Sequence, residues 1–135
     1  MLFYAGLIFY LSSLHHPQVP RFPYSDKIYH AIIYCGFGFL FVRALNPSRD
    51  PTHFGWSQVR ILEVAALGAT VYGLTDEFHQ IFVAGRSPEV GDLIADGIGG
   101  LLGGTLYLLT AYVERRLRKG KVPDCHQAME SPEAR

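Results

Sequence analysis

The chain has 135 residues, which is enough for one domain, and its formal net charge at pH 7 is +0. A neutral chain lacks the broad basic face of a nucleic-acid-binding protein, and a hydrophobic content of 49% argues against intrinsic disorder. Its two cysteines, Cys35 and Cys125, stand in an apolar run and in a polar tail, so we predict no disulfide framework.

Long apolar stretches follow one another along the chain, and each is predicted to form a membrane-crossing helix. A bilayer core about 30 Å thick needs roughly 20 helical residues. A soluble helix bundle would need a polar face on each helix, whereas residues 97–113 contain no charged side chain. The sequence therefore predicts an all-α fold, a polytopic membrane bundle of four transmembrane helices at about residues 1–15, 27–45, 58–83 and 92–114.

Breaks and basic residues predict the domain limits and the orientation. The first stretch has no positive n-region and no cleavage site after it, so we expect a retained helix. We expect residues 1–113 to form the membrane domain and residues 114–135 to form a basic, disordered tail. With four crossings, the side shared by the two termini carries most of the lysine and arginine residues, which predicts that both termini are cytoplasmic.

The predicted outer half of the bundle holds polar residues that are unusual in membrane helices. Such residues are costly in a bilayer and usually face a bundle interior or a wet cavity. We expect them to converge in one polar cluster that binds a ligand or holds the helices together. The predicted residues are Asp26, Lys27, His30, Tyr34, Asp76, Glu77, Gln80, Arg86, Asp92 and Asp96.

This cluster has several interpretations. Its carboxylates outnumber its bases, so the surplus charge needs protonation, water or a bound cation. The carboxylates could pair with Lys27 and Arg86 in a clamp between helices, line a pocket for a polar headgroup, or support acid–base catalysis by His30 or Glu77. His30, Glu77, His79 and Asp92 are metal-ligating types, but no pair has the H-E-x-x-H spacing, so we predict no metal and no cofactor.

Glycines in the last apolar stretch predict close helix packing. Gly99-x-x-x-Gly103 and Gly100-x-x-x-Gly104 give this helix a smooth surface on which a neighbouring backbone can approach. We expect packing within the bundle in preference to dimerisation.

Several of these segments together resemble the VanZ-like family of small bacterial membrane proteins, named after a teicoplanin-resistance protein. They are Asp26-Lys27-x-x-His30-x-x-x-Tyr34, Gly73-x-x-Asp76-Glu77-x-x-Gln80, Gly85-Arg86, and Asp92 before the glycine-rich helix. The resemblance covers about residues 1–113 and implies a multi-pass protein of the bacterial plasma membrane, with a link to glycopeptide resistance in some members. The chain departs from the family pattern at Asp96, where asparagine is usual, and this adds a carboxylate to the site.

Two classes of function follow. The favoured one is a non-enzymatic protein of the VanZ type that acts at the cell envelope, in the manner of teicoplanin resistance. The alternative is a small membrane enzyme acting on a lipid or cell-wall precursor headgroup. The expected partners are the lipid bilayer and such a headgroup, and no nucleic acid.

Overall fold

The computed structural model describes residues 1–14, 24–46, 57–84 and 86–119, and these ranges contain helices and turns but no strand. The elements are α1 (Leu2–Ser12), α2 (Ser25–Leu45), α3 (Gln58–Gln80) and α4 (Val90–Lys119). The all-α class predicted from the sequence is therefore confirmed over the described part of the chain.

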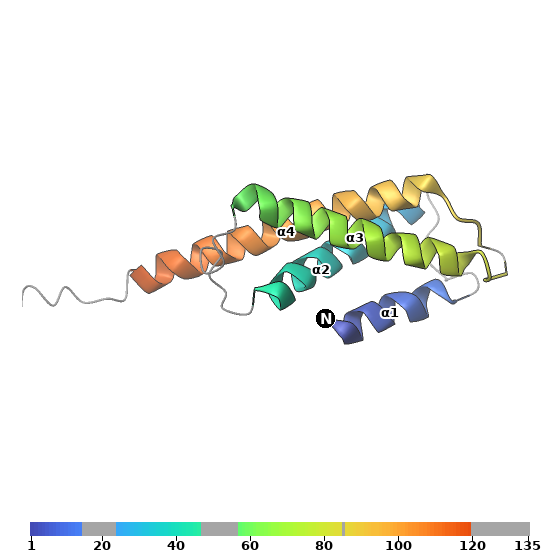
Figure 1. Cartoon of the computed structure of the whole chain (residues 1–135), viewed down its shortest axis with the longest axis horizontal. Helices are drawn as coiled ribbons and strands as arrows, with labels where there is room; N and C mark the ends of the chain where they lie inside the picture. Colours follow the sequence, from blue (N-terminus) through green and yellow to red (C-terminus); the bar gives the residue numbers. More distant parts are fainter. Residues whose placement is uncertain (15–23, 47–56, 85, 120–135) are drawn as a thin grey trace, which may run out of the picture.

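The longest helix, α4, organises the bundle. It packs against both α2 and α3, whereas α1 makes smaller contacts with α2 and α3 at the edge (Figure 1). Helices α2 and α4 begin at the same end of the bundle, and α3 ends there, so α3 runs opposite to both. The last turns of α4 extend beyond α2 and α3 at the other end (Figure 1).

Glycines set the distance between α4 and its neighbours. A Cβ built on Gly103 would meet backbone atoms of Cys35 and Phe39 in α2, and one on Gly100 would lie 2.6 Å from the Ala65 carbonyl oxygen in α3. No side chain fits between backbones this close. The predicted close packing within the bundle is confirmed.

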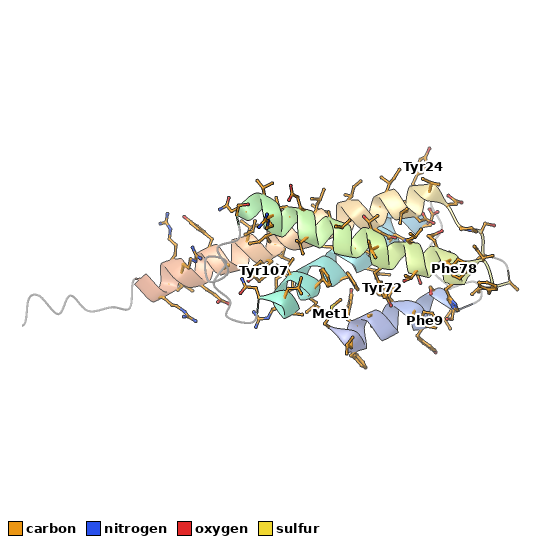
Figure 2. The ribbon with its side chains drawn as sticks, in the orientation of Figure 1. Met1, Phe9, Tyr24, Tyr72, Phe78 and Tyr107 are labelled. Carbon is orange, nitrogen blue, oxygen red and sulfur yellow. The ribbon has the colours of Figure 1, made fainter. Side chains whose placement is uncertain are left out.

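Apolar and aromatic side chains fill the interior away from the polar end. One buried cluster contains Ile8, Tyr34, Phe37 and Ala69, and a second contains Val42, Ile61, Ala65 and Tyr107. Tyr72 lies between α3 and α1, where its hydroxyl donates a hydrogen bond of 2.7 Å to the Ala5 carbonyl oxygen (Figure 2). This contact joins α1 to the bundle.

The outer surface is apolar, in contrast to that of a soluble bundle. On α3, Leu67, Val71, Leu74 and Phe78 recur at helical spacing and are all exposed. A contiguous apolar surface of this kind marks contact with a membrane or a partner. Two described helices, Ser25–Leu45 and Val90–Arg118, are long and apolar enough to cross a membrane.

The helix ends differ from the sequence expectation. Helix α3 ends at Gln80, and residues 81–84 form a turn where the prediction continued the helix to residue 83. Helix α4 continues to Lys119, so residues 114–119 of the predicted tail are helical. Arginine and lysine are good helix formers, so a charged sequence does not by itself end a helix. The rest of the predicted tail lies outside the described residues.

Candidate functional site

The polar side chains gather at the end of the bundle where α2 and α4 begin and α3 ends. Asp26 stands in the first turn of α2, and Asp92 in the first turn of α4. A carboxylate near a helix N-terminus interacts favourably with the partial positive charge of the helix dipole. The starts of α2 and α4 therefore favour Asp26 and Asp92, whereas α3 presents its C-terminus here and its dipole gives Asp76 and Glu77 no such stabilisation.

Lys27 forms the centre of an ion-pair network at the rim of this site. Its Nζ donates hydrogen bonds to Glu89 Oε2 at 2.7 Å, Asp26 Oδ2 at 3.1 Å and Asp92 Oδ1 at 3.2 Å. The lysine stem passes over Gly91, where an added Cβ would lie 2.6 Å from Lys27 Cε. Lys27 thus joins the start of α2 to the start of α4, as the clamp interpretation predicts for this residue.

A histidine–carboxylate pair lies deeper in the bundle. His30 Nδ1 is 2.9 Å from Asp96 Oδ1, and the Asp96 side chain is 0% exposed. The His30 ring stacks on the ring of Tyr34, which restricts its orientation. On the opposite helix, the missing side chain of Gly73 leaves room for the Asp96 carboxylate.

The last turn of α3 contributes two more buried carboxylates. Glu77 Oε2 accepts a hydrogen bond of 2.8 Å from the backbone N–H of Glu89. Gln80 Nε2 donates a weak hydrogen bond of 3.4 Å to Asp76 Oδ2. Each carboxylate therefore has one oxygen engaged, and the other remains available.

Several buried polar atoms of this site have no hydrogen-bond partner within the described residues. A buried polar atom without a partner costs free energy, so such atoms often mark a place where water, an ion or a ligand binds. In this cluster they are Tyr34 Oη, Asp76 Oδ1, Glu77 Oε1, Arg86 Nε and Asp96 Oδ2.

Arg86 does not take part in the predicted clamp. Among the described residues its side chain forms no ion pair with a carboxylate, and its buried Nε has no hydrogen-bond partner. Its backbone N–H donates to the Val83 carbonyl oxygen in the turn after α3. The clamp interpretation is therefore wrong for Arg86, because the turn does not carry its guanidinium to an acidic partner.

Within the described ranges, metal-ligating atoms meet at two places. The ligand atoms of His30, Glu77 and Asp92 lie within 4.8 Å of one another, and so do those of Asp26, Glu89 and Asp92. The sequence predicts no metal site, because no pair of these residues has the spacing of a metal-binding motif along the chain. Each of the first three residues comes from a different helix, so no spacing motif could reveal the group.

Glu89 is the site residue that the sequence analysis missed. It lies just before α4, where it binds Lys27 through its side chain and Glu77 through its backbone. Its position three residues before Asp92 was the available signal, since this places both carboxylates near the same helix start. His79, by contrast, lies apart from this network: its Nε2 is 2.9 Å from Ser13 Oγ of the segment after α1.

Comparison with known proteins identifies one family. The family model described as VanZ/LLP1 matches residues 1–111 of the chain. This range includes α1 to α3, most of α4 and every residue of the polar cluster. No curated protein and no solved structure matches the chain.

Proposed function

The chain belongs to the VanZ/LLP1 family, and we propose that it is a multi-pass plasma-membrane protein that binds a polar headgroup at the outer face of the cell envelope. The binding is non-enzymatic and contributes to resistance of the glycopeptide or teicoplanin type. The observation that carries this proposal is the set of unpartnered, buried polar atoms at one end of an otherwise apolar bundle.

The chemistry of these atoms favours an amphoteric ligand. Asp76 Oδ1 and Asp96 Oδ2 are acceptors that need hydroxyl, amine or ammonium donors, while Arg86 offers a donor to an anion. A phospholipid or lipid-linked precursor headgroup carries a phosphate beside such donors. The phosphate suits the arginine guanidinium, which binds phosphate oxygens in a bidentate manner.

We further propose that all four helices cross the membrane, in addition to the two that are long and apolar enough by themselves. Helix α3 has 23 residues and reaches about 35 Å at 1.5 Å per residue, which exceeds the bilayer core of about 30 Å. Helix α1 has 11 residues and reaches only about 16 Å, yet its surface is almost entirely apolar and largely exposed. Both termini are proposed to be cytoplasmic, which puts the polar cluster in the outer half of the membrane.

Expression in a glycopeptide-sensitive bacterium tests the function. We expect the wild-type chain to lower teicoplanin susceptibility, and the Asp76→Asn and Arg86→Ala variants to lose this effect. Glu63→Gln is the matched control, because Glu63 is an exposed carboxylate on the same helix as Asp76 but outside the cluster.

Lipid profiling of the same strains separates binding from catalysis. An unchanged profile, together with native mass spectrometry of the purified chain retaining a headgroup-bearing lipid, supports binding. A new lipid or precursor species that depends on His30 or Glu77 would instead establish the enzyme alternative. Variants that fold, insert and act like the wild type would refute a role for the cluster.

A further inference from the structure

The group His30, Glu77 and Asp92 has the features of a metal centre. One imidazole nitrogen and two carboxylate oxygens converge within 4.8 Å from three separate helices. Three protein ligands with an open position are typical of catalytic or substrate-binding zinc sites, whereas structural zinc sites have four. We propose that this group binds one divalent transition-metal ion of the Zn²⁺ class.

The surroundings of His30 fit a metal ligand. Its Nδ1 lies 2.9 Å from Asp96 Oδ1, so Nδ1–H donates to a fully buried carboxylate and Nε2 is left to bind the ion. Metal-binding histidines almost always donate their second ring N–H in this way, which fixes the tautomer and raises the basicity of the ligating nitrogen. Stacking on Tyr34 further fixes the plane of the ring.

The two carboxylates are each held by one oxygen. Glu77 is only 6% exposed, and its Oε2 is fixed by the Glu89 backbone while its buried Oε1 has no partner in the described part of the chain. Asp92 Oδ1 accepts a hydrogen bond from Lys27, and its other oxygen forms no hydrogen bond with any described residue. Each carboxylate therefore keeps one free oxygen in a fixed position.

The second acidic group, Asp26, Glu89 and Asp92, differs in this respect. The Lys27 ammonium already binds all three of these carboxylates. Asp26 and Glu89 are also exposed, so their remaining oxygens are not buried polar atoms that need a partner within the bundle. In the deeper group the ammonium binds only Asp92, through Oδ1, and it reaches neither His30 nor Glu77. The histidine of this group favours Zn²⁺ over Mg²⁺ or Ca²⁺, which prefer oxygen ligands alone.

Metal analysis of the full chain tests the inference without any assay of activity. The purified protein in detergent micelles is stripped with a chelator, exposed to Zn²⁺ alone and freed of excess metal. We expect one zinc per chain. Titration calorimetry should show that His30→Gln weakens zinc binding more than tenfold, and Asp96→Asn should weaken it about 10- to 100-fold, as is usual for a second partner of a ligating histidine.

Controls of the same residue types separate this site from adventitious zinc. His79→Gln removes a histidine from α3, and Glu63→Gln removes an exposed carboxylate from the same helix. Both variants should bind zinc as the wild type does. Zinc binding that is equal in the wild type and in His30→Gln, or that is lost in His79→Gln, would overturn the proposal.

X-ray absorption spectroscopy of the zinc-loaded wild-type chain tests the site without any variant. Its result is therefore unaffected by a variant that fails to fold. We expect a shell of nitrogen and oxygen at about 2.0–2.2 Å, with scattering from one imidazole and none from sulfur. A sulfur shell would assign the metal to a cysteine, and two or more imidazoles would assign it to other histidines. Either result, or a wild-type chain that retains no zinc, would refute the site. The test does not depend on headgroup binding, because zinc is the only ligand added and its own coordination shell is what is measured.

Discussion

Replacing Gly99 by alanine is expected to separate α2 from α4 beside the polar cluster. A Cβ at this position would lie 2.5 Å from the Ala31 carbonyl oxygen and 3.0 Å from both Cys35 N and Tyr34 Cβ. Two of these neighbours are backbone atoms, so a side-chain rotation cannot relieve the contact. The helices must move apart instead.

The expected magnitude follows from two opposing effects. Overpacking a close contact costs typically 1–3 kcal/mol, and a contact with backbone belongs near the upper end of this range. Alanine also favours a helix over glycine by about 1 kcal/mol. The free energy of unfolding of Gly99→Ala should therefore fall by about 1–2 kcal/mol.

Gly6→Ala provides the matched control. No heavy atom lies within 4 Å of a Cβ built on Gly6 in α1. This variant should unfold like the wild type or be more stable by up to about 1 kcal/mol. Equilibrium unfolding with sodium dodecyl sulfate in mixed micelles, followed by circular dichroism, measures both variants.

The same variant tests the position of the polar pair. Because Ala31 adjoins His30 and Gly99 lies one turn after Asp96, the added methyl group should also lengthen the His30–Asp96 contact. We expect Gly99→Ala to weaken zinc binding, whereas Gly6→Ala should leave it unchanged. A Gly99→Ala chain that is as stable as Gly6→Ala would show that α2 and α4 do not approach each other as described here.

Three further predictions concern the network, α1 and the topology. Lys27→Ala should lower the melting temperature in detergent more than Arg86→Ala does, because Lys27 binds carboxylates and Arg86 binds none among the described residues. Equal melting temperatures of the two variants would refute the rim network. Tyr72→Phe should reduce the free energy of unfolding by about 0.5–1.5 kcal/mol through loss of its hydrogen bond to α1, and an unchanged denaturation curve would contradict that contact. A topology reporter fused after Arg135 should lie in the cytoplasm, and a reporter inserted in residues 84–91 should lie outside the cell. If a reporter at the N-terminus lies on the side of the membrane opposite the tail, α1 does not cross the membrane.

Hydrophobic runs and turn residues predicted the existence and order of the helices, but they located some ends poorly. Ile81 to Val83 continue the apolar pattern of α3, so periodicity gave no reason to end the helix at Gln80. In the structure these residues form a turn, and the Val83 carbonyl oxygen accepts a hydrogen bond from the backbone N–H of Arg86. At the other end of α4, the basic residues after Val113 are good helix formers, and the helix continues through them.

Convergence of the polar residues was predictable, whereas their pairing was not. Helix order and direction alone bring Lys27, Asp76 and Asp92 to one end of the bundle. Whether Lys27 or Arg86 reaches an acidic group depends on side-chain length, on the room left by Gly91 and on the path of a turn. Glu89 escaped the sequence analysis because it was assigned to a loop, although its backbone and side chain join α3 to α2.

The clamp and the binding pocket are competing interpretations of the sequence, and the side chains that each invokes lie at different depths in the structure. At the rim, the Lys27 ammonium binds three carboxylates and joins the starts of α2 and α4. One turn deeper, Asp96 is 0% exposed and Glu77 is 6% exposed, and each keeps an unpartnered oxygen. Because the nearest lysine is already engaged at the rim and Arg86 binds no described carboxylate, the deeper acids lack a cationic partner apart from His30. The rim network therefore holds the helices in register, and the deeper layer is where a cation or a donor-bearing headgroup would be most strongly stabilised.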